Sequence, residues 1–300
     1  MNLLVTGAWQ GFENCRQEIL SMGHDVAFLQ WEKESLPVDY DWVEGVIGNG
    51  FFLTHPIEKF ENLRYIQLTS AGYDRVPMDY VEEHHIEIYN ARGVYSIPIA
   101  EYAVGGVLQL YKHFREFAES QKKHEWNKIR EIRELYGSTV CILGCGSVGS
   151  ECAKRFAAFG CRVLGVDVCQ MSREYYVSIV SIEELNTVLG QADILVITLP
   201  LTDMTRGLVG QDALKALKEG ALVVNIARGG LMDYGALTTG LKDGYIGGAV
   251  LDVFEAEPLD PESPLWDMKQ VIITPHNSFA GDGNQYRLNR VIIDHLKALS

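Results

Sequence analysis

The sequence lacks any apolar run long enough to cross a bilayer, and it is poor in positive charge. Its 300 residues include 26 lysines and arginines against 40 aspartates and glutamates, a formal net charge of −14. Such a surplus of negative charge repels polyanions, which argues against nucleic acid and anionic membranes as partners. The first residues lead directly into a predicted strand and not into a signal peptide, so we expect a cytoplasmic protein.

Cysteine is also scarce, with six residues in the whole chain. Five of them fall around one predicted strand–helix–strand unit: Cys141, Cys145, Cys152, Cys161 and Cys169. No two of these have the close two-residue spacing that is typical of zinc sites, so we expect no metal. We interpret them as small buried hydrophobic residues that remain reduced.

The remaining composition is that of a globular protein, and the length suggests two modest domains. In the first part, short apolar strands alternate with helical stretches. The strands are predicted at 3–6, 25–29, 45–48, 65–69 and 86–90, and a helix at 13–23 ends in a glycine. Strands that alternate with helices indicate a parallel sheet.

A long helical segment follows, from Ser96 to Lys128, with Pro98 in its first turn. A second alternating unit starts at Val140. Its strands are predicted at 140–144, 162–167, 194–200, 221–227, 247–253 and 271–275, and the last residues, from Arg287, are predicted to be helical. The fold class is therefore α/β, with two domains that each contain a parallel sheet.

One glycine turn in the second unit has the features of a dinucleotide site. Gly144, Gly146 and Gly149 follow a predicted strand at the spacing G-x-G-x-x-G. The first glycine allows the tight turn, the second lets a pyrophosphate approach the backbone, and the third lets the next helix pack close to the sheet. The helix that starts near Ser147 directs amides at the phosphates, and Asp167 lies where a carboxylate would bind the adenine ribose.

A second glycine turn lies near the start of the chain, between Gly7 and Gly11. The bulky residues Trp9 and Gln10 occupy positions where a phosphate would need close approach to the backbone. The next predicted strand ends in Gln30 and not in an acid, although Glu32 lies close by. We interpret this turn as a structural strand–helix connection; a nucleotide site near Gly7 is the alternative.

Three polar residues follow predicted strands in the second unit: Arg228, Glu257 and His276. The carboxyl ends of parallel strands share one edge of a sheet, which is where ligands bind in open α/β folds. An arginine, a carboxylate and a histidine from three strand ends are therefore predicted to converge on one catalytic site. The other seven histidines lie in no comparable motif and are interpreted as surface or packing residues.

With these motifs in place, nearly the whole chain resembles the D-isomer-specific 2-hydroxyacid dehydrogenase family. The phrases that carry the resemblance are ILGCGSVG with Asp167, ITLPLTDMTRGLVG, NIARGGLMD, LDVFEAEPL and TPHNS, together with the earlier LTSAGYDRV. Several motifs in the right order at compatible spacing are more specific than any one of them. The resemblance implies an NAD-dependent enzyme that interconverts a small 2-oxo acid and its D-2-hydroxy acid.

The resemblance also implies roles for the catalytic residues. Arg228 would hold the substrate carboxylate and carbonyl with its bidentate fork. His276 would donate a proton to the carbonyl oxygen as hydride arrives, and Glu257 would orient His276 and favour its protonated form. Backbone amides of Ser70, Ala71 and Gly72 would bind the substrate carboxylate.

The resemblance also implies a larger set of positions at which the protein would bind NAD. Asp252 would meet the nicotinamide end, and Leu199, Pro200 and Thr205 would line the path of the cofactor. The complete set is Gly144, Gly146, Ser147, Val148, Gly149, Asp167, Leu199, Pro200, Thr205, Ile226, Ala227, Arg228, Asp252 and His276.

The family layout implies a flavodoxin-like substrate domain, residues 1–95 with 281–300, and a Rossmann-type NAD-binding domain, residues 96–280. The active site would lie in a cleft between them, and closure of the domains would exclude water. The helical segment 96–128 would be the dimerisation arm of a homodimer. An ordinary amphipathic helix that packs on its own core is the alternative.

Two questions about function stay open from the sequence. The loop after the strand at 45–48 contains no arginine for a substrate phosphate, which favours a small apolar 2-oxo acid. The same family resembles corepressors that keep the fold and the catalytic residues but act through partners, so an NAD(H)-sensing binding protein is the alternative function. The substrate itself cannot be named from these motifs.

Overall fold

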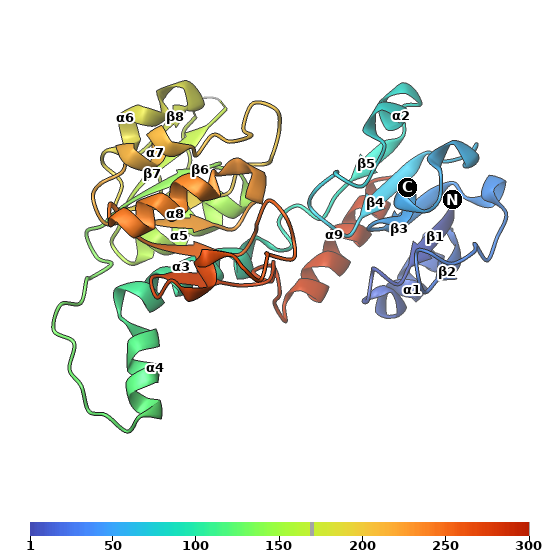
Figure 1. Ribbon diagram of the computed structural model, residues 1–300. Coiled ribbons are helices and arrows are strands. Elements are labelled where there is room, and N and C mark those ends of the chain that lie inside the picture. Colours follow the sequence, from blue (N-terminus) through green and yellow to red (C-terminus); the bar gives the residue numbers. More distant parts are fainter. Residues whose placement is uncertain (169–170, 300) are drawn as a thin grey trace. The chain divides into compact units, whose positions relative to one another are not determined.

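The computed structural model describes residues 1–168 and 171–299, which form two compact units. Unit 1 is Met1–Tyr95 together with the segment that begins at Gly281, and unit 2 is Ser96–Ala280. Each unit is built on a single sheet, and every strand pair in both sheets is parallel (Figure 1). The expectation of two α/β domains with parallel sheets is therefore confirmed.

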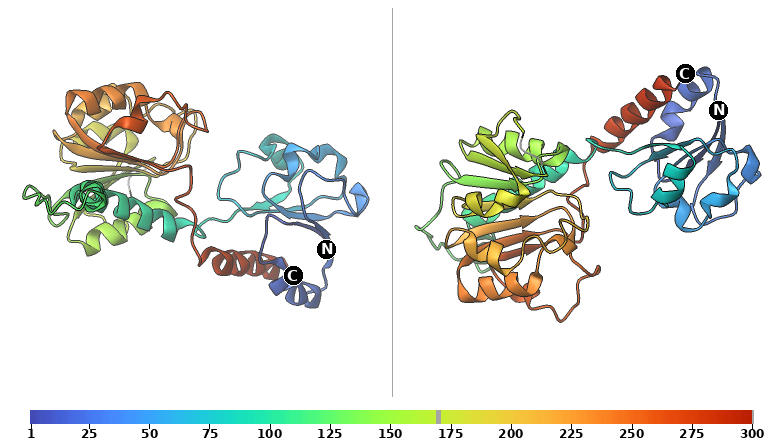
Figure 2. Two further views of the ribbon diagram at one scale, coloured as in Figure 1. Left: turned by 60° about the horizontal axis from the view of Figure 1, so that its bottom comes forward. Right: turned by 90° about the horizontal axis from the view of Figure 1, so that it is seen from above.

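The sheet of unit 1 has the strand order β2-β1-β3-β4-β5, a doubly wound order of the flavodoxin type. Its strands are β1 (Asn2–Thr6), β2 (Asp25–Leu29), β3 (Gly45–Gly48), β4 (Tyr65–Leu68) and β5 (Glu87–Tyr89). Its helices are α1 (Phe12–Ser21), α2 (Met78–Glu83) and α9 (Asn284–Ala298). Helices α1 and α9 pack together on one face of this sheet (Figure 2).

Alternation along β1 explains how this sheet is covered on both faces. Leu3 and Val5 belong to the apolar cluster that contains α1 and α9, whereas Leu4 belongs to a second cluster on the other face. Successive side chains of a strand point to opposite faces, so a strand buried on both faces is apolar over most of its length. The four residues from Leu3 to Thr6 are all buried.

The sheet of unit 2 has the order β12-β11-β10-β9-β6-β7-β8. Its strands are β6 (Thr139–Leu143), β7 (Arg162–Asp167), β8 (Ser178–Ser181), β9 (Ile194–Ile197), β10 (Ala221–Asn225), β11 (Ile246–Leu251) and β12 (Val271–Ile273). This is the Rossmann order with one added strand, and the order reverses at β6, which lies between β7 and β9.

Helices cover both faces of the unit 2 sheet. One apolar cluster joins α3 (Ser96–Tyr111) and α5 (Ser147–Ala158) to the sheet. The other cluster joins α6 (Leu185–Leu189), α7 (Gln211–Ala216) and α8 (Tyr234–Asp243) to the opposite face. The described cysteines fit the interpretation as hydrophobic residues, because Cys15, Cys141, Cys145 and Cys152 are buried and Cys161 is half-buried. Cys169 lies outside the described residues.

The prediction of one helix from Ser96 to Lys128 is wrong. Helix α3 ends at Tyr111, a second helix, α4, spans Phe114–Lys122, and residues 123–138 are not helical (Figure 1). His113 has a left-handed backbone with φ of 54°, which interrupts the helical hydrogen bonds. Apolar packing supports α3 but does not reach α4, which has no buried residue, so only α3 behaves as the ordinary core helix of the alternative interpretation.

The sequence prediction also omitted the edge strand β8 and placed strand ends too late. Strand β9 ends at Ile197 and not at Pro200, and β10 ends at Asn225 and not at Ala227. Leu199, Ile226 and Ala227 beyond these ends are apolar and buried, so hydrophobicity alone does not mark where the ladder of hydrogen bonds stops. Among the described residues, no helix has the length and apolar character required to span a membrane.

Candidate functional site

The glycine turn after β6 is shaped for a ligand and not only for the packing of the protein. Gly144 has φ of +99°, and a Cβ there would lie 2.7 Å from the backbone nitrogen of Leu199. At Gly149 a Cβ would lie 1.9 Å from the carbonyl oxygen of Gly144. At Gly146, by contrast, a Cβ would meet nothing within 4 Å. The protein itself therefore requires glycine at two of these positions, and Gly146 leaves open space beside the backbone.

Hydrogen bonding at this turn is consistent with an anion site. The Cys145 amide donates to Asp167 Oδ2 over 2.6 Å, and the Val168 amide donates to Oδ1 over 2.7 Å. The Ser147 hydroxyl is paired with Ser96 Oγ over 2.8 Å. Within the described residues, the amides of Gly146, Ser147 and Val148 donate to no protein acceptor, so the N-terminus of α5 presents free donors to a phosphate.

The front turn, between β1 and α1, is filled by the protein. A Cβ on Gly7 would lie 2.3 Å from the carbonyl oxygen of Gln30, and a Cβ on Gly11 would lie 1.9 Å from Asn289 Oδ1. Trp9 is 1% exposed, and its Nε1 donates to the same Asn289 oxygen over 2.8 Å. These contacts support the interpretation as a structural connection and leave no space for the alternative nucleotide site.

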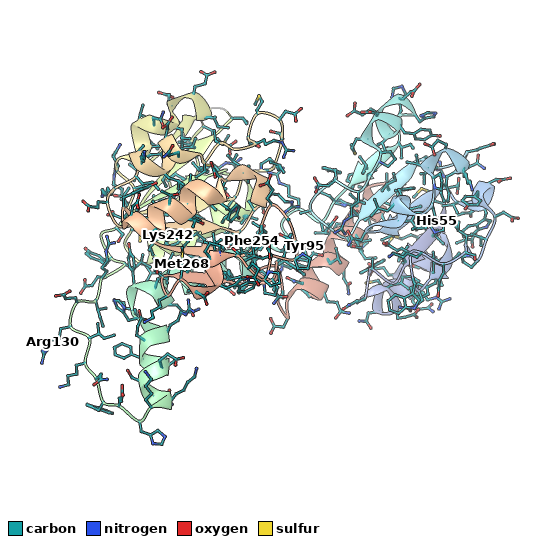
Figure 3. The ribbon with its side chains drawn as sticks, in the orientation of Figure 1. His55, Tyr95, Arg130, Lys242, Phe254 and Met268 are labelled. Carbon is teal, nitrogen blue, oxygen red and sulfur yellow. The ribbon has the colours of Figure 1, made fainter. Side chains whose placement is uncertain are left out.

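Three neighbouring strands carry the predicted catalytic residues. Arg228 follows β10, Glu257 follows β11 and His276 follows β12, and these strands are adjacent in the sheet. The loop after β10 and the loop after β11 approach closely at Gly229. A Cβ on Gly229 would lie 2.0 Å from the backbone carbonyl carbon of Phe254. Phe254 is labelled in Figure 3. Parallel strands put all three loops at one edge of the sheet.

A hydrogen bond joins the side chains of the histidine and the glutamate. His276 Nδ1 lies 2.8 Å from Glu257 Oε2, and the side chains are 42% and 37% exposed. The other carboxylate oxygen of Glu257 accepts the amide of Phe254 over 3.0 Å. The carboxylate is therefore fixed at both oxygens, and the pairing leaves Nε2 of His276 for a substrate.

Asp252 anchors the loop that carries His276. Its side chain is fully buried, and it accepts hydrogen bonds from the Thr274 hydroxyl (2.6 Å) and from the amides of Asn277 (2.8 Å) and Ser278 (3.0 Å). The His276 amide donates to the Asp252 carbonyl oxygen over 2.8 Å, and His276 itself has φ of 50°. These bonds give the carboxylate a positioning role that the motif did not indicate.

Two residues that the motif search missed fix the position of Arg228. Asn225 is fully buried; its side chain donates to the carbonyl oxygen of Arg228 over 3.2 Å and accepts from the amide of Ala227 over 3.2 Å. It also donates to the hydroxyl of Tyr234, which in turn donates to the carbonyl oxygen of Val253. Asn225 is a polar residue at the end of an otherwise apolar strand, and this is the sequence signal that could have identified it.

The positions predicted to line the path of the cofactor are mostly interior. Leu199, Thr205, Ile226 and Ala227 are buried, and Pro200 is exposed. The Thr205 hydroxyl donates to the carbonyl oxygen of Pro200 over 2.7 Å, so it closes the loop after β9. The buried residues therefore support the loops after β9 and β10 from the protein interior.

In unit 1 the predicted substrate-carboxylate loop follows β4. Ser70 Oγ donates to the carbonyl oxygen of Gly72 over 3.2 Å, and the Asn90 side chain donates to that of Ala71 over 2.7 Å. Among the residues that the structure describes, the amides of Ser70, Ala71 and Gly72 donate to no protein acceptor. Consecutive free amides in a turn are suited to binding a carboxylate.

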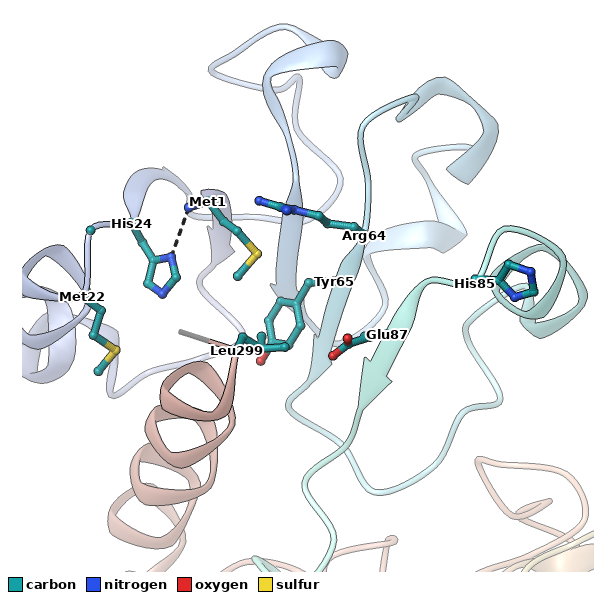
Figure 4. Close-up of a pocket in the computed structure, with 9 residues that line it drawn as sticks. Met1, Met22, His24, Arg64, Tyr65, His85, Glu87 and Leu299 are labelled. Carbon is teal, nitrogen blue, oxygen red and sulfur yellow. Dashed lines mark hydrogen bonds between the residues drawn. The ribbon is translucent and has the colours of Figure 1, made fainter.

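A hollow of about 490 Å³ in unit 1 lies elsewhere (Figure 4). Its lining includes His24, Arg64 and Glu87, which precede or begin strands, so it lies at the amino edge of the sheet, opposite the Ser70–Gly72 loop. None of the predicted site residues lines it. In residues 1–168 and 171–299, no group of three or more histidine, cysteine, aspartate or glutamate side chains could hold a metal ion.

Comparison with known proteins identifies the family of this chain. Residues 104–278, all within unit 2, match the family model described as D-isomer specific 2-hydroxyacid dehydrogenase, NAD binding domain. The chain is 34% identical to D-3-phosphoglycerate dehydrogenase of Methanocaldococcus jannaschii over 80% of this chain and 46% of that protein. It is 32% identical to glycerate dehydrogenase of Methylorubrum extorquens over 81% of this chain and 77% of that protein.

Solved structures agree in fold. A D-isomer specific 2-hydroxyacid dehydrogenase family protein from Aeromonas salmonicida has a TM-score of 0.83 at 28% identity, with 99% of this chain and 94% of that chain covered. The corresponding dehydrogenase from Xanthobacter autotrophicus, in complex with NADPH and MES, has a TM-score of 0.81 at 27% identity, with 99% and 95% covered. The chain spans about half the length of the phosphoglycerate dehydrogenase above. These relatives are named as dehydrogenases, and nothing in the comparisons supports the corepressor-like alternative.

Proposed function

Because the chain belongs to the D-isomer-specific 2-hydroxyacid dehydrogenase family and its cofactor is NAD, we propose that it interconverts a small 2-oxo acid and the D-2-hydroxy acid. Residues 96–280 would be the NAD-binding domain, and residues 1–95 with 281–300 the substrate domain. The same assignment makes Arg228, Glu257 and His276 the catalytic residues.

One observation carries this proposal: His276 Nδ1 lies 2.8 Å from Glu257 Oε2 at the sheet edge that also carries Arg228. Reduction of a carbonyl group requires a proton donor for the oxygen and a cation for the acid group. A histidine whose second nitrogen is held by a carboxylate is suited to the first task, and a guanidinium to the second.

The residues near the glycine turn fit NAD. The open space at Gly146 would admit the pyrophosphate, the free amides of Ser147 and Val148 would bind it, and Asp167 would accept the ribose hydroxyls. Bound NADH supplies the hydride for reduction. Asp252 would act by holding the histidine loop, since all the bonds of its buried carboxylate are made within the protein.

The other steps are assigned to the side chains. Arg228 would bind the substrate carboxylate and polarise the carbonyl group, and the amides of Ser70, Ala71 and Gly72 would bind the same carboxylate. His276 would donate the proton from Nε2 to the carbonyl oxygen as the hydride arrives at the carbon. Glu257 would stabilise the positive imidazolium before transfer, and oxidation would use the same groups in reverse.

The test is turnover of glyoxylate, hydroxypyruvate and pyruvate, followed by the loss of NADH absorbance. We expect activity with at least one of these acids, a D-configured product, and a fall in kcat of about two to four orders of magnitude in His276→Asn. NADH should still bind to His276→Asn, because the glycine turn after β6 would hold the pyrophosphate. His84→Asn, an exposed histidine of unit 1, is the matched control and should keep full activity.

Two results would count against the proposal. Near-normal turnover in His276→Asn would remove the histidine from proton transfer. The absence of turnover with every 2-oxo acid, in a protein that binds NADH, would reject the enzyme itself.

We also propose that the protein is a cytoplasmic homodimer, which associates through the segment 96–128. Helix α4 has no buried residue, and Phe114 and Trp126 are 55% and 93% exposed. Exposed aromatic side chains of this kind are typical of an interface. Sedimentation should give a dimer for the wild-type chain and a monomer for the Phe114→Ser, Trp126→Ser double variant.

A further inference from the structure

The carboxylate of Glu32 spans three strands at the carboxyl edge of the unit 1 sheet. Glu32 follows β2, and its Oε1 accepts from the Thr6 hydroxyl (2.9 Å) at the end of β1 and from the Asn49 amide (2.6 Å) beyond β3. Its Oε2 accepts from the Gly50 amide over 2.8 Å. Two consecutive amides of the loop after β3 thus bind a carboxylate that the chain itself supplies.

This arrangement is fixed by further contacts. The Glu32 carbonyl oxygen accepts from the Thr54 hydroxyl and from His55 Nε2, each over 2.9 Å. His55 is 6% exposed and stacks on Phe51 with ring centroids 4.5 Å apart. A Cβ on Gly48 would lie 2.7 Å from Glu32 Oε1, so the strand end is glycine where the carboxylate approaches. Glu32 is held at both its main chain and its side chain.

The loop that Glu32 binds lies beside the proposed binding loop for the substrate carboxylate. Strand β3 pairs with β4, with Gly48 opposite Leu68, so the Asn49–Gly50 loop and the Ser70–Gly72 loop leave neighbouring strands at the same edge. The proposed function, on which this inference rests, places the substrate carboxylate at Ser70–Gly72. A substrate side chain that extends along the edge toward β3 would therefore meet the loop that Glu32 holds.

We propose that Glu32 determines substrate class, by selecting 2-oxo acids with uncharged side chains over those that carry a second anionic group. The amides of Asn49 and Gly50, which could have bound a phosphate or a carboxylate, are already occupied. The negative charge of Glu32 also repels a second anion at close range. The effect combines the loss of donors with electrostatic repulsion.

Arg75 approaches the same loop, and its positive charge acts in the opposite direction to that of Glu32. Arg75 is exposed, and its Cδ lies 3.7 Å from where a Cβ on Gly50 would be. Among the described residues, Arg75 and Glu32 form no ion pair within 4 Å. Removal of the Glu32 charge would leave the attraction of Arg75 unopposed, so the variant Glu32→Gln should accept anionic side chains better than the wild type does.

The experiment compares hydroxypyruvate with 3-phosphohydroxypyruvate, two substrates that differ in the charge of the side chain. The measured quantity is the ratio of kcat/KM for hydroxypyruvate to kcat/KM for the phosphorylated substrate. This ratio should exceed one in the wild type. Glu32→Gln should reduce it by about tenfold, the size expected of one screened charge pair. The change should fall on the KM of the phosphorylated substrate. Glu34→Gln removes the same charge from an exposed neighbour and serves as the matched control.

A measurement on the wild type avoids any question of whether the variant folds. Selection by charge weakens as ions screen it, so raising the salt concentration should lower the wild-type ratio. A ratio unchanged by both salt and Glu32→Gln, in a protein that turns over hydroxypyruvate, would overturn this inference and leave the proposed function intact. A wild type that prefers the phosphorylated substrate would overturn it too. No turnover of any 2-oxo acid would reject the proposed function, and this inference with it.

Discussion

The two glycine turns begin in the same way and differ in what surrounds their glycines. After β1, the space beside Gly7 and Gly11 is occupied by Gln30 and by Asn289 of α9. After β6, the space beside Gly146 is open. A glycine can serve the packing of the protein or the approach of a ligand, and the neighbouring atoms decide which of the two applies.

The acids that follow each second strand show the same contrast. Asp167 accepts the amide of Cys145 and so remains at its own glycine turn. Glu32 instead reaches past β1 to the amides of Asn49 and Gly50, away from the turn at Gly7. Substitutions at the turn in unit 1 should therefore change the free energy of unfolding, whereas substitutions at the turn in unit 2 should change the affinity for NADH.

The largest expected effect is the loss of folding stability after a substitution in the turn between β1 and α1. Trp9→Ala removes a fully buried ring and its hydrogen bond to Asn289, and should lower the free energy of unfolding by about 3–5 kcal/mol. The dissociation constant for NADH should stay unchanged in the folded protein. Chemical denaturation and a binding titration measure the two quantities. Trp31→Ala, which removes a tryptophan that is 65% exposed, controls for lost fluorescence, and a large loss of NADH affinity in Trp9→Ala would break the comparison.

Gly146→Val should have the converse effect. The new side chain meets no protein atom at its Cβ, so the free energy of unfolding should change by less than about 1 kcal/mol. It would occupy the space of the pyrophosphate, and we expect NADH to bind about a hundredfold more weakly. Gly210→Val is a matched control, because Gly210 also precedes a helix with extended backbone and its Cβ would have no contact under 3.5 Å. Unaltered NADH affinity in Gly146→Val would mean that the ligand binds elsewhere.

Asp167→Ser should have a moderate effect on the choice between NADH and NADPH. The carboxylate would accept ribose hydroxyls and repel a 2′-phosphate, so the wild type should prefer NADH. The variant should narrow this preference by about 1–3 kcal/mol, the value of one charge-assisted hydrogen bond. Taking the ratio of the two dissociation constants cancels any general loss of binding caused by the lost bond to Cys145. A wild type that binds NADPH as tightly as NADH would contradict this prediction.

The smallest expected effect is on the acid stability of unit 1. Burial lowers the pKa of His295 below its ordinary value of 6.5, and Asp294 opposes this shift. The unfolded chain then takes up the proton first, so stability is present above about pH 6.5 and is lost as pH falls through the lower pKa of the folded state. His295→Gln should flatten this pH dependence in denaturation curves for unit 1. An equally steep curve for the variant would assign the effect to other groups.

The sequence indicated most of the fold for a local reason. The apolar runs of β1 and β6, followed by glycine turns, contain the signals that start and end strands, and these signals extend over a few residues. The break at His113 was missed because the aromatic pattern continues through it, although the packing that supports α3 stops at Tyr111. Periodicity describes a face and cannot show whether another element covers it.

The sequence by itself determined which residues follow the strands of a parallel sheet, and hence that Arg228, Glu257 and His276 are at one edge. Only the tertiary structure decided that Glu257 pairs with His276, that buried Asp252 holds the histidine loop, and that Glu32 binds the loop after β3. Local propensity fixes each element, whereas these bonds join residues that are 17 to 25 positions apart. Their formation depends on the order in which the strands pair, which no single segment of the sequence contains.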